Sequence, residues 1–159
     1  MQIKIRPMTG EDKPAIMHIL RATPEFKPCE VVVAEEVLDS YLNDPSAGYF
    51  TLVAETDTAA IAGYVCFGTT PLTEGTWDIY WIAVARGMQG KGIGAALLTV
   101  AENKIRQVEG RLIFAETSSI PEYDKTRRFY QSRGYGVAAQ IADFYVPGDD
   151  KVIFQKRLK

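Results

Sequence analysis

Three glycines at alternate positions form the part of the sequence whose residue types point most directly to chemistry. They lie in Gln89-Gly90-Lys91-Gly92-Ile93-Gly94, between an apolar run at 79–84 and a helical pattern that continues to Val108. A glycine loop at a helix start leaves backbone N–H groups free to bind an anion, and the helix dipole adds partial positive charge there. Lys91 adds a full charge. The segment therefore predicts a site for a phosphorylated cofactor.

Two familiar phosphate-binding motifs must be weighed against this loop. Residues 90–95 fit the dinucleotide fingerprint G-x-G-x-x-G/A, and Glu116 lies near the distance where that fold places an acidic residue. The segments before the loop, however, are typical of successive strands, and too little chain follows for the repeated strand–helix units of a dinucleotide fold. The P-loop pattern fails because Lys91 is followed by Gly92 rather than by Ser or Thr.

Hydrophobic periodicity predicts the elements that must position the loop. In chain order these are a strand ending at Pro7, a helix capped by Thr9 and ending at Thr23-Pro24, a helix over 32–42, strands over 49–55, 61–68 and 79–84, a helix over 93–108, a strand over 111–115, a helix over 121–132, and strands over 134–144 and 152–158. Ser119 and Glu122 have capping-box spacing at the start of the last helix. Because a helix joins the strands at 79–84 and 111–115, we expect that pair to be parallel.

The loop and a second segment together resemble one family. Gln89-x-x-Gly92-x-Gly94 after an apolar strand resembles the pyrophosphate loop of the GNAT N-acetyltransferase superfamily, and residues 129–135 resemble that family's second signature, a tyrosine four residues before a Gly-aromatic pair. The predicted order of elements is also that of the GNAT fold. The resemblance covers essentially the whole chain, and it implies a mixed α/β (α+β) sheet of about seven strands with four helices.

The resemblance assigns roles to particular residues. It implies acetyl-CoA as the cofactor, bound by Ile82, Ala83, Val84, Gln89, Gly90, Lys91, Gly92, Ile93, Gly94, Tyr123 and Tyr130. Tyr123 stands where many relatives have asparagine, which puts its contact with the cofactor in doubt. Tyr130 would protonate the departing thiolate, because a phenol with a pKa near ~10 can return a proton to a thiolate with a pKa near ~8.5.

Acetyl transfer to an amine also needs a proton acceptor, because an alkylamine with a pKa near ~10.4 is protonated at neutral pH. His18, the single histidine, lies between core positions of the first helix, and we interpret it as a surface residue. Asp78 is the first candidate base, since several family members carry a catalytic glutamate there. By strict alternation Asp78, Tyr80 and Ile82 share one strand face. Glu116, at the end of the parallel strand, is the second candidate, and a water chain without a dedicated base is the third possibility.

Composition limits the remaining choices. The chain has 159 residues and a net charge of −2, so we expect one domain over residues 1–159, with no nucleic-acid or membrane partner. Cys29 and Cys66 show no metal-ligand spacing, and residues 1–6 lack the apolar core of a signal peptide. These features favour a reduced, cytoplasmic protein without a metal site.

We therefore expect an N-acetyltransferase that moves an acetyl group directly to a primary amine of a small molecule or amino-acid-like acceptor. Acidic residues in the loops that would face the acceptor (Glu30, Glu74, Asp149 and Asp150) are compatible with a cationic amine or simply with a solvated rim. The alternatives are acetylation of protein N-termini or lysines, and a non-catalytic acyl-CoA-binding regulatory module. A homodimer formed through the late strands is compatible with the fold.

Overall fold

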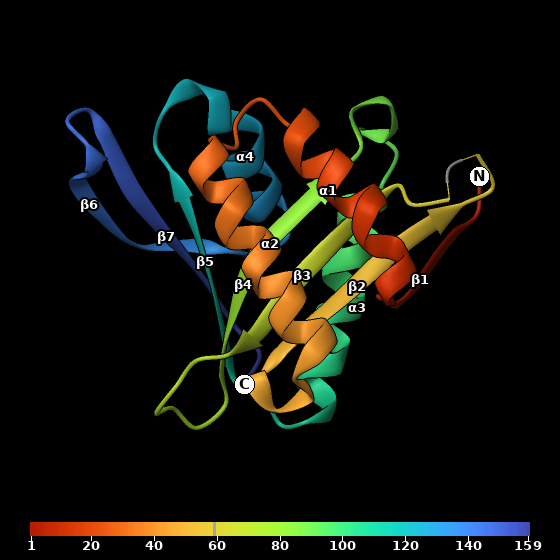
Figure 1. Cartoon of the computed structure of the whole chain (residues 1–159). Helices are drawn as coiled ribbons and strands as arrows, with labels where there is room; N and C mark the ends of the chain where they lie inside the picture. Colours follow the sequence, from red (N-terminus) through yellow and green to blue (C-terminus); the bar gives the residue numbers. More distant parts are fainter. Residues whose placement is uncertain (59) are drawn as a thin grey trace.

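The computed structural model describes residues 1–58 and 60–159, and within these a single mixed sheet carries helices on both faces (Figure 1). The strands are β1 (Ile3–Pro7), β2 (Tyr49–Thr56), β3 (Gly63–Thr69), β4 (Thr76–Val84), β5 (Leu112–Ser118), β6 (Gly136–Val146) and β7 (Asp149–Arg157). The helices are α1 (Lys13–Ala22), α2 (Pro28–Asn43), α3 (Ile93–Gln107) and α4 (Asp124–Ser132). The predicted class, a mixed sheet with seven strands and four helices among the described residues, is confirmed.

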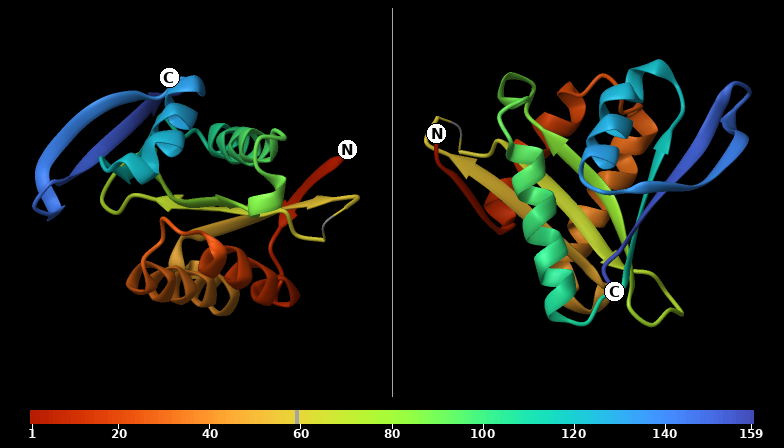
Figure 2. Two further views of the ribbon diagram at one scale, coloured as in Figure 1. Left: turned by 90° about the horizontal axis from the view of Figure 1, so that it is seen from above. Right: turned by 180° about the vertical axis from the view of Figure 1, so that it is seen from behind.

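Two apolar layers separate the helices from the sheet. Figure 2 shows α1 and α2 on one face, with α3 and α4 on the other. The α3 layer is centred on Leu97, Ile105 and Phe154, whereas the α1–α2 layer is centred on Ile16, Leu20 and Leu38. All of these side chains are at least 98% buried. Burying such stripes contributes roughly 1.5–3 kcal/mol per large side chain before the loss of conformational entropy is subtracted.

Strand order places β4 in the middle of the sheet, which runs β1-β2-β3-β4-β5-β7-β6. The β4–β5 pair is parallel, as the connecting helix predicts, and the other neighbours are antiparallel. The β4–β5 ladder joins Thr76–Ile79 to Leu112–Ala115 only. Beyond these pairs the two strands diverge, as Figure 1 shows, and leave an opening in the sheet.

A β-bulge in β4 reverses the face alternation expected from the sequence. Cys66 is opposite Trp81 and Phe67 is opposite Ile79, so Tyr80 is the extra residue. Trp77 and Ile79 pack in the α3 layer before the bulge, and after it Ile82 and Val84 face that layer. The prediction that Asp78, Tyr80 and Ile82 share one face is therefore wrong at Ile82, because a bulge adds one residue to one strand only.

The start of α4 also differs from the expectation. A short 3₁₀ turn over Pro121–Tyr123 precedes α4, and the residue at its N-cap position is Ile120, which makes no side-chain capping bond. The Ser119 hydroxyl instead accepts a hydrogen bond from the Asp150 N–H at 2.8 Å. The predicted capping box is therefore wrong, because the β6–β7 turn binds the serine that the helix was expected to use.

Candidate active site

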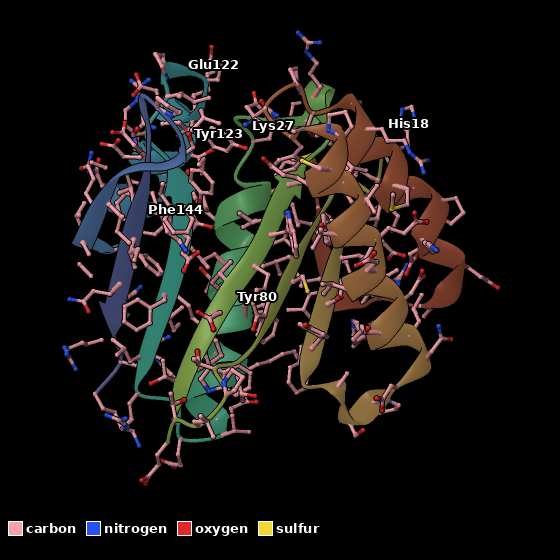
Figure 3. All side chains as sticks on the ribbon, turned by 60° about the vertical axis from the view of Figure 1, so that its left-hand side comes forward. His18, Lys27, Tyr80, Glu122, Tyr123 and Phe144 are labelled. Carbon is pink, nitrogen blue, oxygen red and sulfur yellow. The ribbon has the colours of Figure 1, made fainter. Side chains whose placement is uncertain are left out.

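A cavity of about 710 Å³ occupies the opening between β4 and β5. The residues that line it come from the α1–α2 loop, the start of α2, β4, β5, the start of α4 and the β6–β7 hairpin. Figure 3 shows Tyr80 on β4 inside this region, with Tyr123 and Lys27 above it and Phe144 on the hairpin side. His18 lies on the outer side of α1, where its side chain is exposed. The cavity thus connects segments that are far apart in the sequence.

Tyr130 reaches this cavity from the α4 side of the sheet. Its ring stacks on Phe154 at 5.7 Å and meets Tyr135 edge-on at 5.4 Å, so it is only 4% exposed. Burial raises the pKa of Tyr130 well above its ordinary value, because an anionic phenolate is poorly solvated there. The hydroxyl is therefore held in its protonated form.

Asp78 and Glu116 enter the cavity from β4 and β5 on the α1–α2 side. Asp78 accepts a hydrogen bond from Thr70 Oγ1 at 2.6 Å, and Glu116 is paired with Lys151 at 2.8 Å. Burial raises the pKa of Asp78, the Thr70 hydroxyl lowers it, and the nearby Glu116 charge raises it again. The structure therefore brings both predicted carboxylates into the same cavity. Because β5 continues to Ser118, Glu116 lies inside the strand rather than at its end.

Tyr123 lines the same cavity but directs its hydroxyl toward the α1–α2 loop. The hydroxyl donates to the Glu25 carbonyl at 3.0 Å and lies 3.4 Å from Glu30 Oε2. Burial raises the pKa of Tyr123, and the neighbouring glutamates add to that shift. Tyr123 therefore links α4 to the start of α2.

The glycine loop forms a second cavity of about 360 Å³ at the start of α3. Gly90 and Gly92 have φ of +76° and +84°, values that L-residues with a Cβ rarely adopt, and a Cβ at either would meet only open space. Gln89, Gly90, Gly92, Ile93 and Gly94 line this cavity, while Lys91 is not among the lining residues. The first N–H groups of an α-helix lack intrahelical partners. Open space over a glycine backbone beside these donors fits a pyrophosphate group.

The two cavities are adjacent. Ile82, Val84 and Gln89 line both, and Gln89 Nε2 donates to the Val84 carbonyl at 3.3 Å. Beyond the β4–β5 pairs, the upper part of β4 faces the opening with backbone groups that β5 does not engage. The site therefore continues from the glycine loop along β4 to Asp78, with Ala83 lining the first cavity on the way.

Several residues of the site were not predicted from the sequence. Lys125, Thr126 and Arg133 line the glycine-loop cavity from α4 and the residue after it, and Tyr145 lines the larger one from β6. Basic residues on the helix that carries Tyr130 were a usable signal for the first group, whereas Tyr145 gave no signal. Asp149, which was expected on the acceptor side, does line the larger cavity, from β7. Thr117 lines it too, and among the described residues its buried Oγ1 has no hydrogen-bond partner.

The sequence matches the acetyltransferase (GNAT) family over residues 14–135. This match spans most of the chain and includes the glycine loop and Tyr130. The chain belongs to the GNAT acetyltransferase family. The resemblance noted from the two motifs is thereby confirmed. A comparison with curated proteins finds no match.

Solved structures agree with this assignment. A GNAT-family acetyltransferase from Desulfovibrio desulfuricans is 39% identical, with a TM-score of 0.93 over 99% of this chain and 100% of that one. A Salmonella typhimurium protein solved with its cofactor acetyl-CoA is 23% identical, with a TM-score of 0.80 over 100% of this chain and 95% of that one. The Escherichia coli ribosomal-protein-S18-alanine N-acetyltransferase is 18% identical, with a TM-score of 0.79 over 99% and 95% of the two chains. The last two show the shared fold.

In the described part of this GNAT protein, no helix is long and apolar enough to cross a membrane.

Proposed function

We propose that this GNAT protein transfers an acetyl group from acetyl-CoA to a primary amine of a small molecule, directly and within a ternary complex. The observation that carries the proposal is the continuity of the two cavities along β4, with anion-binding backbone at one end and carboxylates at the other. The Salmonella relative with acetyl-CoA supports the choice of cofactor.

Each end of the site has a proposed task. The loop residues Gln89, Gly90, Lys91, Gly92, Ile93 and Gly94 hold the pyrophosphate, with Lys125 and Arg133 as additional cations. The backbone of Ile82, Ala83 and Val84 binds the pantetheine arm in the manner of an added strand, and Tyr123 packs beside it. Bound acetyl-CoA supplies the acetyl thioester. Its reacting end then lies between Tyr130 and the two carboxylates.

Proton transfers complete the proposed reaction. Asp78 takes a proton from the ammonium form of the acceptor, directly or through a water, and frees the nitrogen lone pair. The C–N bond forms, the C–S bond breaks, and Tyr130 donates a proton to the departing sulfur. The second proton that the nitrogen loses on becoming an amide returns to Tyr130 through solvent, and Asp78 releases its proton to bulk water. Glu116 is the second candidate base, although its ion pair with Lys151 favours a role in holding the acceptor.

Two assays on the purified protein test the proposal. Acetyl-CoA and CoA, but not NAD, should raise the melting temperature, since a ligand at 100 times its Kd adds about 2.7 kcal/mol to native stability. Release of free thiol with a panel of small amines should then report turnover. Binding without turnover on any amine would favour a regulatory module, and turnover only on peptides would favour an N-terminal or lysine acetyltransferase.

The cellular setting and the oligomeric state are also proposals. Two free cysteines, one of them exposed, support a reduced cytoplasmic compartment. A homodimer through β6 is supported by its position at the sheet edge and by the exposed side chains of Val137, Ile141 and Val146. Light scattering of the full chain at several concentrations tests the dimer, and a monomer throughout would exclude it.

A further inference from the structure

The larger cavity is strongly acidic. Five of its lining residues are carboxylates (Glu25, Glu30, Asp78, Glu116 and Asp149), against a single lysine, Lys27. Aromatic rings from Phe26, Tyr80, Trp81, Tyr123 and Tyr145 line the same space. Aromatic faces and carboxylates together are the surroundings that an ammonium group and its alkyl chain prefer.

These carboxylates differ in whether the protein gives them a counter-ion. Glu116 is paired with Lys151, whereas Asp78 and Glu30 accept hydrogen bonds from the hydroxyls of Thr70 and Tyr123. Among the described residues, neither Glu30 nor Asp149 has an ion pair, although Lys27 lies near enough to Glu30 to lower its pKa against the larger effect of burial. Asp149 is only 4% exposed, and its one side-chain bond comes from the Ser118 hydroxyl. A buried carboxylate without a counter-ion is costly, and Lys27 is the one cationic side chain in the lining of this cavity, so the lining favours a cationic ligand.

Glu30 and Asp149 line the same cavity, although one comes from α2 and the other from β7. The charge of Asp149 raises the pKa of Glu30, after the larger effect of burial. Glu116, Asp149 and Glu30 all act on Tyr145, whose pKa is raised first by burial and then by these three charges. Glu30 and Asp149 therefore belong, together with Glu116, to one negative region of the cavity that also contains Tyr145.

The reacting nitrogen cannot neutralise this region throughout the reaction. It must lose its proton before it attacks, and the amide that it becomes is neutral. A cation that stays at Glu30 and Asp149 must therefore belong to a different part of the acceptor.

From Glu30 and Asp149, which line the cavity without an ion pair among the described residues, we infer that the acceptor carries a second positive charge, as an α,ω-diamine does, and that these two carboxylates bind it. This inference rests on the proposed transferase function. It names the substrate class and assigns specificity to two side chains outside the reacting centre.

The test compares acceptors of matched length at saturating acetyl-CoA, with thiol release as the readout. The kcat/KM for 1,5-diaminopentane should exceed that for pentylamine by about tenfold or more, the size of effect that one favourable charge contact gives. The acid 5-aminopentanoate should be the poorest acceptor. Diamines with three to six methylenes then define the best span.

Two substitutions test whether Glu30 causes the preference for the diamine. Glu30→Gln should lower the diamine-to-pentylamine ratio of kcat/KM about tenfold, because it removes the charge and keeps the shape. Glu36→Gln, an identical change at an exposed position of the same helix, serves as the control and should leave the ratio unchanged. A ratio near one in the wild type, or a ratio that Glu30→Gln does not alter, would overturn the inference and leave the transferase proposal intact. No turnover on any of these amines would overturn both.

Discussion

The two ends of the site differ in composition: backbone forms one end and side chains form the other. The glycine-loop end consists largely of backbone from one continuous segment, in which Gly90 and Gly92 give access to free N–H groups. The acceptor end consists of side chains from β4, β5, α2 and the β6–β7 hairpin. Backbone recognition from one segment suits a ligand that a whole family shares. Side chains from separate segments can change one at a time, and they suit the part of the reaction in which relatives differ.

The largest expected effect lies where the two ends meet. Tyr130→Phe should lower kcat by about 100-fold or more, because it removes the proton donor and keeps the buried ring. The affinity for acetyl-CoA, measured by calorimetry, should change little. Tyr41→Phe removes a hydroxyl that bonds the Met8 carbonyl away from both cavities, and it is the matched control. Equal kcat values for the Tyr130 variant and the wild type would remove Tyr130 from the chemistry.

A substitution at the acceptor end should change the pH dependence. A base must be ionised, so kcat/KM should rise with pH through the raised pKa of Asp78, and Asp78→Asn should lose this rise and about 100-fold in rate at pH 7. Because the folded-state pKa lies above the unfolded value of about 3.9, ionised Asp78 destabilises the fold as pH rises through that window. The asparagine variant should therefore melt no lower than the wild type at pH 7. A pH–rate profile identical to that of the wild type would assign the proton transfer elsewhere, with Glu116→Gln as the next variant.

A smaller effect is expected at the glycine-loop end. Gly92→Ala places a Cβ on a residue with φ of +84°, which costs about 1 kcal/mol of stability and obstructs approach to the backbone. We expect roughly tenfold weaker binding of acetyl-CoA, with an unchanged diamine preference. Gly10→Ala introduces a Cβ that meets nothing within 4 Å and is the control for the added methyl group. Full affinity in the Gly92 variant would argue against the loop as the pyrophosphate site.

The smallest effect concerns Thr117, which stands between the two ends. Its Oγ1 is buried without a partner among the described residues, so Thr117→Val should raise the melting temperature of the free protein slightly. Val152, its partner on β7, belongs to the layer that contains Tyr130, so the hydroxyl lies on the cofactor side of the sheet. We expect kcat to fall a few-fold if that hydroxyl binds a water or a polar group of the ligand. A more stable variant with full kcat would show that the hydroxyl has no part in turnover.

The same difference, between one local segment and side chains from distant segments, explains how much of the fold and of the site could be predicted from the sequence. Periodicity and the glycine loop predicted the element order, the parallel β4–β5 pair and the family, since these depend on local patterns. Asp78 was found because several family members carry a catalytic glutamate there, and Glu116 because it was expected at the end of the parallel strand. The bulge at Tyr80 was missed, because an extra residue in one strand is visible only against its partner. The hydrogen bonds that join Ser118 to Asp149 and Ser119 to Asp150 were missed for a related reason, since each pair is 31 positions apart in the sequence.

The bulge at Tyr80 determines which changes in the sequence of β4 the site can tolerate. Residues before and after it follow opposite phases of the strand, so Asp78 faces the α1–α2 side while Ile82 and Val84 face the α3 layer. Deleting one residue at this position would restore simple alternation and turn either Asp78 or the segment proposed to bind the cofactor to the opposite face. Replacing Tyr80 with another residue keeps the phase. In this strand, therefore, the length of the segment is under tighter constraint than the identity of its most exposed residue.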